Sequence, residues 1–192
     1  EDTEGNIWFG TKEGVSIYTP VTKQWKHLNS GTDAMFSSNS TMSITEDGNG
    51  DMWISTFAGG ITVCDKNLHI KRKIMTTNSS LTSDDIFVLY RDRDKDIWIS
   101  GEDGNLNCYD SSSQQLKLYS VNSRIRTITE TQAGDILVSG IRGVQKIDKK
   151  NGKIENVFSP KNQNKHIMVY SVLEDEKGRL WFATDGLGVI CQ

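Results

Sequence analysis

Short apolar runs alternate with turn residues along the whole chain. The segments 61–64 and 106–109 are examples, because apolar or aromatic side chains recur in them between polar ones and Gly, Asn or Asp lie close by. Runs of this kind are typical of β-strands. No window longer than a strand shows the period of a helix, so the pattern predicts an all-β fold.

One motif recurs five times: an apolar-aromatic-apolar core, then small residues and a glycine turn. Its central residues are Trp8, Trp53, Trp98, Leu137 and Trp181, which differ in position by 45, 45, 39 and 44. That spacing matches one blade of a β-propeller, which takes about 40 to 50 residues. The repeat therefore predicts consecutive four-stranded antiparallel blades.

Each period accommodates four strands, with the motif as the second. We expect inner strands at 42–46, 86–90, 125–129 and 169–173, third strands at 15–18, 61–64, 106–109 and 144–147, and outer strands at 24–28, 70–74, 116–119 and 154–158. The first period lacks an inner strand and the last lacks an outer one, so no closure uses every strand once. We expect a single partial propeller domain of about four to five blades from a larger, seven-bladed propeller, with segments of approximately 1–41, 42–84, 85–123, 124–167 and 168–192.

Glycine marks the turn of the first hairpin in four of the five repeats, at Gly5, Gly50, Gly134 and Gly178. Glycine adopts positive φ without a steric penalty, which suits such a turn. Lys95 holds this position in the third repeat, so we expect a different turn there.

Composition narrows the function classes. The net charge is −3, with 35% hydrophobic and 24% charged residues, which favours neither disorder nor nucleic-acid binding. The longest apolar runs are strand-length, far short of the roughly 20 residues of a membrane span. The sequence opens on Glu1 and Asp2, so we expect any targeting signal to lie outside this segment.

The metal-ligand types are poorly placed for a metal centre. The three cysteines fall in third strands of different blades and are expected to be buried free thiols. The three histidines have no paired spacing, so zinc is not predicted. Asp92, Asp94 and Asp96 alternate as in a calcium loop, but they lie on a hairpin turn without the distal glutamate of such loops. We expect no metal and no cofactor.

Recognition is expected on the face formed by the turns between second and third strands and by the links from outer strands to the next inner strands. These segments vary while the first hairpins repeat, and variable loops on a rigid scaffold commonly carry binding. The candidate ligand contacts are Phe57, Asp103, Arg124, Arg142 and Asp185. The motif tryptophans and Trp25 are expected to pack between blades rather than to bind sugar.

The repeated Asp-x-x-Gly-x-Ile/Leu-Trp-Ile/Phe-Gly/Ser/Ala-Thr pattern, with the segment 80–86 leading into an inner strand, resembles the two-component regulator propeller repeat. The fourth repeat departs from it with Thr131 for Asp and Leu137 for Trp. The resemblance implies the periplasmic sensor region of a hybrid two-component histidine kinase, which detects oligosaccharides and regulates glycan-utilisation genes. It implies no catalysis in this segment, because the kinase lies elsewhere in such proteins, and it carries over no ligand residues.

The expected partners are an oligosaccharide or other small ligand, the remaining blades and domains of the parent sensor, a possible homodimer, and no nucleic acid. Two alternatives remain. One is a propeller enzyme of sialidase or lyase type, although the seven arginines are scattered along the sequence and no arginine cluster is evident. The other is a protein-interaction scaffold of the WD-repeat kind, although the Trp-Asp blade ending is missing.

Overall fold

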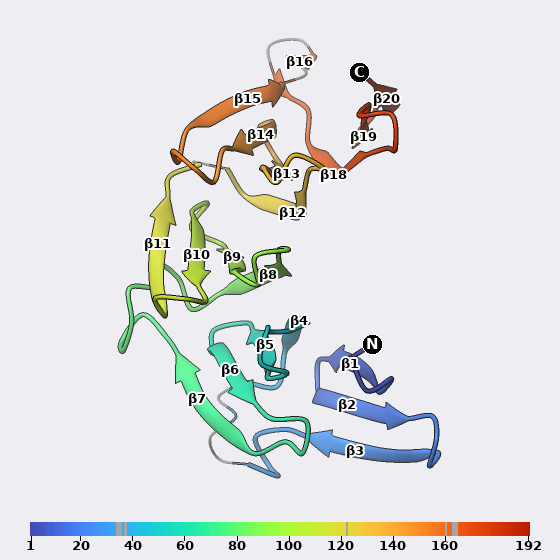
Figure 1. Cartoon of the computed structure of the whole chain (residues 1–192), viewed down its shortest axis with the longest axis vertical. Helices are drawn as coiled ribbons and strands as arrows, with labels where there is room; N and C mark the ends of the chain where they lie inside the picture. Colours follow the sequence, from blue (N-terminus) through green and yellow to red (C-terminus); the bar gives the residue numbers. More distant parts are fainter. Residues whose placement is uncertain (34–35, 37, 122, 160, 163–164) are drawn as a thin grey trace.

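The computed structural model describes residues 1–33, 36, 38–121, 123–159, 161–162 and 165–192. Antiparallel β-sheets stand side by side around an open arc, and β4, β8, β12 and β18 lie toward its concave side (Figure 1). The described residues contain no helix, and hence no helix that is long and apolar enough to cross a membrane. The predicted all-β propeller architecture is confirmed.

Each blade is a sheet of strands that follow one another in the sequence. Blade 1 holds β1 (Ile7–Thr11), β2 (Gly14–Thr19) and β3 (Gln24–Leu28). Blade 2 holds β4 (Thr41–Glu46), β5 (Met52–Thr56), β6 (Gly60–Cys64) and β7 (Ile70–Ile74). Blade 3 holds β8 (Ile86–Arg91), β9 (Ile97–Gly101), β10 (Leu106–Asp110) and β11 (Gln115–Tyr119).

Blade 4 holds β12 (Ile125–Glu130), β13 (Ile136–Gly140), β14 (Gly143–Ile147) and β15 (Ile154–Phe158). Blade 5 holds β18 (Val169–Glu174), β19 (Leu180–Thr184) and β20 (Gly188–Cys191). The strands agree with the predicted ones to within a residue or two. A two-stranded ribbon of β16 (Lys161–Asn162) and β17 (Lys165–His166) lies in the link after blade 4 and was not predicted.

The hydrophobic core lies between the sheets. Trp53 of blade 2 packs in one cluster with Leu89 and Tyr109 of blade 3, and Trp98 of blade 3 packs with Ile125 and other residues of blade 4. Both indoles are fully buried. Burying about 200 Å² of side chain at roughly 25 cal/mol per Å² gives each indole about 5 kcal/mol of transfer free energy.

The other predicted packing tryptophans are less enclosed. Trp8 and Trp181 are half-buried. Trp25 is exposed, yet it contacts the rings of Tyr18 and Phe9, with the Tyr18 and Trp25 ring centroids 4.9 Å apart. Complete burial is thus limited to the motif tryptophans of blades 2 and 3, which have a blade packed on both sides.

The aspartate and tryptophan of the repeat are partners in a hydrogen bond. Asp47 accepts the backbone N–H groups of Asn49 and Asp51 with Oδ1, and its Oδ2 accepts the Trp53 indole N–H at 3.0 Å. The same indole bond forms in blades 1, 3 and 5, at 2.9, 2.8 and 2.9 Å. The six-residue spacing of the motif therefore places a carboxylate on the indole that follows the hairpin.

Blade 4 loses both members of this pair together. Thr131 replaces the aspartate and Leu137 replaces the tryptophan. The Thr131 hydroxyl still accepts the N–H of Asp135 at 3.0 Å, so the turn keeps one of its side-chain bonds. Leu137 has no polar group, which explains why this blade needs no carboxylate.

The expectation of a different first turn in blade 3 is wrong. Lys95 has φ +72°, close to the +84° of Gly50, and its N–H bonds to the carbonyl of Asp92 at 3.1 Å as in the other turns. A left-handed conformation costs a non-glycine residue about 1–2 kcal/mol. The Asp92 side chain, which holds the Asp96 N–H and the Trp98 indole, offsets that cost.

Two of the three cysteines are buried as predicted. Cys64 and Cys108 are free and enclosed, and burial raises the pKa of the Cys64 thiol to about 12. Cys191 is also free but exposed, which contradicts the expectation. It lies on β20, the edge strand of the blade 5 sheet in the described part of the chain.

Candidate functional site

The face that carries the first hairpins holds the blades together through a repeated glutamate. The last residue of an inner strand reaches back to the first hairpin of the preceding blade and accepts a backbone N–H there. Glu46 binds the Thr3 N–H at 2.7 Å, Glu130 the Arg93 N–H at 2.9 Å and Glu174 the Gln132 N–H at 2.6 Å. In blade 3 an arginine replaces the glutamate, and Arg91 donates to the carbonyl of Asp47.

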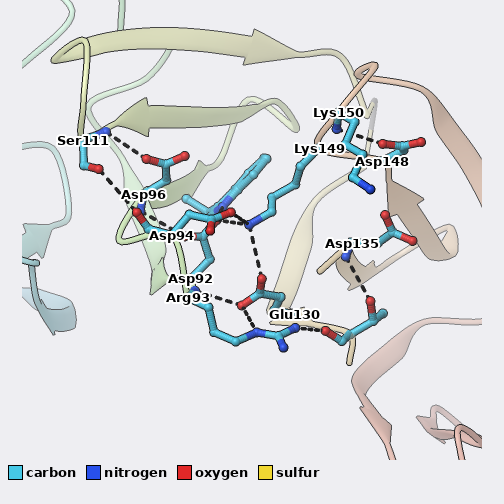
Figure 2. Close-up of polar contacts among 12 residues, drawn as sticks. Asp92, Arg93, Asp94, Asp96, Ser111, Glu130, Asp135, Asp148, Lys149 and Lys150 are labelled. Atoms are coloured by element: carbon cyan, nitrogen blue, oxygen red, sulfur yellow. Dashed lines mark hydrogen bonds and ion pairs between the residues drawn. The ribbon is translucent and has the colours of Figure 1, made fainter. Parts of the chain in front are cut away.

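A partly buried lysine completes this clasp between blades 3 and 4 (Figure 2). Lys149 Nζ lies 2.9 Å from Asp92 Oδ2, 2.5 Å from Asp94 Oδ2 and 3.2 Å from Glu130 Oε1. Arg93 bonds Glu130 from the other side, at 3.0 Å. The ammonium group therefore stands among the three carboxylates that could otherwise group around a metal ion.

Blade 2 repeats the arrangement. Lys66 follows its third strand as Lys149 follows that of blade 4, and its Nζ lies 3.0 Å from Glu46 Oε1 and 2.7 Å from the hydroxyl of Thr3. Lys66 Nζ also lies 3.5 Å from Glu4 Oε1. Because a lysine holds the same position among carboxylates at both blade junctions, we assign these two lysines a structural role. The Asp92 cluster is a junction between blades rather than a cation site.

The charges of the clasp are mutually stabilised. Burial opposes ionisation of Glu130, but the bonds from the Arg93 backbone, the Arg93 guanidinium and Lys149 outweigh it and lower the pKa of the carboxyl. Burial likewise disfavours charged Lys149, yet its bonds to Asp94, Asp92 and Glu130 raise the pKa of the ammonium group. Glu130 and Lys149 are thus both ionised near neutral pH.

The opposite face of the arc, here called the loop face, carries the turns between second and third strands. Each of four turns donates a backbone N–H to the link that precedes the inner strand of its own blade. The bonds run from Phe57 to Ser40 at 2.9 Å, Glu102 to Asp85 at 3.0 Å, Ile141 to Arg124 at 3.3 Å and Asp185 to Met168 at 2.9 Å. The predicted proximity of turns and links is therefore present in blades 2 to 5.

One buried apolar side chain anchors each link to the protein interior. Phe36, Leu81, Val121 and Ile167 are buried, and the first three belong to core clusters of the blades. Side-chain bonds add to this, since Asp85 accepts the Ala58 N–H at 2.8 Å and Asp84 accepts the Thr76 N–H at 2.8 Å. The loop face is thus a preorganised surface, which lowers the entropy cost of binding.

All five candidate contact residues are exposed on this face, in turns or links of four blades. Phe57 is 50% exposed, and Arg124 forms an ion pair with Glu102 of the neighbouring blade. Asp103 accepts hydrogen bonds from Asn105 within its own turn. Arg142 lies next to Ile141, whose N–H binds the Arg124 carbonyl, so these two arginines are close in space although distant in sequence. No bond joins Phe57 or Asp185 to the other candidates within the described part of the chain.

The structure adds candidate contact residues that the sequence pattern did not single out. Every inner strand has a register shift after its first residue, which leaves one residue without a cross-strand partner. These residues are Met42, Phe87, Arg126 and Tyr170. Bulges re-aim side chains and are frequent beside functional sites. Strand propensity predicts the strands but carries no signal for a bulge, so this feature needed the structure.

The cavities between blades 2 and 3 lie near the outer strands. One has a volume of about 440 Å³ and is lined by Arg72, Tyr109 and polar residues. The Arg72 guanidinium lies 5.2 Å from the Trp53 ring centroid and 5.1 Å from that of Tyr109, and it donates to the Tyr109 hydroxyl at 3.1 Å. These contacts occupy the arginine in packing the two blades together.

Three stretches of the chain, residues 35–58, 80–103 and 165–186, match the family described as the two component regulator propeller. They coincide with the links, inner strands and second strands of blades 2, 3 and 5. No curated protein gives a significant match to the sequence.

Solved structures share the fold. The extracellular domain of the putative one component system BT4673 from B. thetaiotaomicron is 22% identical with a TM-score of 0.81, over 100% of this chain and 27% of that one. The extracellular domain of the putative hybrid two component system BT3049 from the same organism is 18% identical with a TM-score of 0.79, over 98% and 26%. An inactive variant of virginiamycin B lyase from Staphylococcus aureus is 15% identical with a TM-score of 0.73, over 100% and 66%. The chain thus spans about a quarter of the first two structures.

Proposed function

We propose that this chain, which carries repeats of the two-component regulator propeller family, is a ligand-sensing part of the extracytoplasmic region of a hybrid two-component regulator. Its loop face binds an oligosaccharide or other small ligand, and the signal passes to domains outside this segment. In a bacterium with two membranes that location is the periplasm. The extracellular domains with the same fold support this placement.

The proposal rests on the difference between the two faces of the arc. The first-hairpin face repeats the same aspartate, glutamate and lysine contacts from blade to blade, as a structural interface does. The loop face repeats only its backbone bonds, and its side chains differ in every blade: Phe57, Glu102, Ile141 and Asp185 hold equivalent positions. A constant backbone with variable side chains is the arrangement expected of a recognition surface.

Catalysis in this segment is not part of the proposal. His27 and His69 lie beside the outer strands, where His27 Nδ1 and the Ser16 hydroxyl are 2.9 Å apart and His69 Nδ1 lies 3.0 Å from Asp65. These two histidines thus interact with a serine and an aspartate of their own blades. The remaining blades and domains of the parent protein, and a second copy of it, are the proposed protein partners.

An oligosaccharide array followed by calorimetry on the intact protein tests this function. Binding without product formation supports a sensor, whereas turnover of the bound sugar establishes the lyase-type alternative. Binding only to a protein partner favours the scaffold.

The matched variants are Phe57→Ala on the loop face and Leu118→Ala on β11, both of which remove an apolar side chain that is about half exposed. We expect the first to weaken binding and the second to leave it unchanged. Equal effects of the two variants contradict the assignment of the loop face.

A further inference from the structure

The arginines of this chain divide into two groups by their contacts. Arg72, Arg91, Arg93, Arg124 and Arg179 each donate to a carboxylate, carbonyl or hydroxyl group of the protein. Arg126 and Arg142 have no side-chain partner among the described residues, and both are exposed. An arginine without a partner keeps its full set of fork-shaped donors available to a ligand.

Both unpaired arginines lie at the loop-face end of blade 4. Arg126 is the bulged residue of β12, between the paired positions Ile125 and Thr127. Arg142 belongs to the turn between β13 and β14, which is fixed to the start of β12 by the bond from the Ile141 N–H to the Arg124 carbonyl. A Cβ on Gly140 would lie only 2.0 Å from that carbonyl oxygen, so the turn and the strand approach closely. Three of the seven arginines thus gather at one corner, contrary to the expectation from their scatter in the sequence.

The carboxylates of the neighbouring turns form no ion pair with Arg126 or Arg142 among the described residues. Glu102 is occupied by Arg124, and Asp103 is occupied by Asn105 of its own turn. Asp185, in the blade 5 turn, donates its backbone N–H to Met168. Within the described residues none of these three carboxylates pairs with Arg126 or Arg142. The two guanidinium groups are therefore uncompensated in a chain whose net charge is −3.

Aromatic residues occupy the equivalent bulges on both sides. Phe87 is the bulged residue of β8, and Tyr170, 48% exposed, is that of β18. The Tyr170 carbonyl accepts the Thr127 hydroxyl at 2.8 Å, which sets this bulge beside that of Arg126. Apolar faces of a sugar ring pack against aromatic side chains, and polar groups placed among such side chains fix a ligand's orientation.

We propose that the blade 4 corner, formed by Arg126 and Arg142 between the bulges of Phe87 and Tyr170, binds the carboxylate or sulfate group of an acidic saccharide. This inference rests on the proposed function and names the ligand class for the loop face. The sugar ring lies against the aromatic bulges, and the oxyanion accepts hydrogen bonds from the two guanidinium groups. Both acidic groups present planar or tripodal oxygens that suit the guanidinium fork.

Calorimetry on the intact protein with tetragalacturonic acid, a sulfated galactan tetrasaccharide and galactotetraose separates the alternatives. We expect one of the two acidic probes to bind, with a Kd that rises with salt, and galactotetraose to bind at least about 10-fold more weakly. The better of the two acidic probes identifies carboxylate or sulfate as the recognised group.

Arg126→Gln and Arg142→Gln are each expected to weaken the acidic probe by about 10-fold or more, which is the loss of one charge-assisted hydrogen bond. Arg126→Lys keeps the charge and is expected to retain part of the affinity. Arg179→Gln removes the same charge from the first-hairpin face and is the control, expected to leave Kd unchanged. Because both tested side chains are exposed, the melting temperature of the variants should equal that of the parent.

The outcomes distinguish this inference from the function on which it rests. If an acidic probe binds and neither arginine variant weakens it, the corner is not the site. If galactotetraose binds as tightly as the acidic probes, the anion preference is wrong while saccharide sensing stands. If none of the probes and no sugar of the array binds, the saccharide function itself is refuted.

Discussion

Removal of the Asp47 carboxylate should destabilise the propeller, and the size of the loss should depend on whether the Trp53 indole is present. Asp47→Ala deletes the acceptor of the Trp53 indole N–H and of two backbone N–H groups in the turn. A hydrogen bond to a charged group contributes about 1.5–3 kcal/mol. Because the backbone N–H groups of the turn can bond to water in the variant, we expect the free energy of unfolding to fall by about 2–3 kcal/mol. Trp53→Leu leaves a cavity in the blade 2 to blade 3 core and is expected to cost about 3 kcal/mol.

The double variant is the informative one. Because the bond is lost in either single variant, Asp47→Ala with Trp53→Leu should cost about 1–2 kcal/mol less than the sum of the single variants. Urea unfolding followed by far-UV circular dichroism measures this coupling without the tryptophan signal. The matched cycle in blade 4, Thr131→Ala with Leu137→Ala, has no indole bond and should show coupling below about 0.5 kcal/mol. Additive effects in blade 2, or equal coupling in both blades, would refute the role given to the pair.

Four further predictions concern the clasp and the loop face. Lys149→Met leaves the buried Asp92 carboxylate without a cation, while Arg93 still pairs with Glu130, and should cost about 3 kcal/mol. Lys117→Met breaks an exposed pair and should cost less than about 1 kcal/mol in the same unfolding assay. The pKa values of Glu130 and Asp94 lie below their ordinary values, so their contribution is full above pH of about 4.5 and is lost as the pH falls through the lowered values. A melting temperature measured from pH 7 to pH 3 should therefore drop steeply below pH of about 4.5, and a flat profile would contradict the charged clasp. Because Lys149 fills the carboxylate cluster, EDTA should leave the melting temperature unchanged, and a chelator-dependent decrease would establish a metal there. Phe57→Ala should leave the melting temperature within about 2 °C of the parent, since the side chain is half exposed, and a larger decrease would show that this ring serves packing instead.

The strand pattern could be predicted because it depends on local properties. The repeat length follows from the 45-residue spacing of Trp8, Trp53 and Trp98. The alternation of apolar residues and the glycine turns predict the order of the strands and nearly their bounds. The same pattern located the loop face, since chain order alone decides which turns share an end of the blades. Lys95 shows the limit, because its left-handed conformation is imposed by the side chain of Asp92 three residues earlier.

The site required information that is not local. The bulges at Met42 and Arg126 arise from pairing across strands, which residue propensities do not record. The proximity of Arg124 and Arg142 depends on a bond between a turn and a link that lie far apart in the sequence. The alternating aspartates 92, 94 and 96 were interpreted as turn residues rather than as a calcium loop. Only the structure shows that Lys149, on the next blade, pairs with Asp92.

Hydrogen exchange of the intact protein, with and without the array oligosaccharide that binds most tightly, tests the central claim most directly. The account predicts that the ligand protects backbone amides in the turns 56–60, 101–105, 140–143 and 184–188 and at the start of the inner strands. The first hairpins and the outer strands should exchange at unchanged rates. Protection confined to those first hairpins or outer strands would contradict the assignment of ligand binding to the loop face.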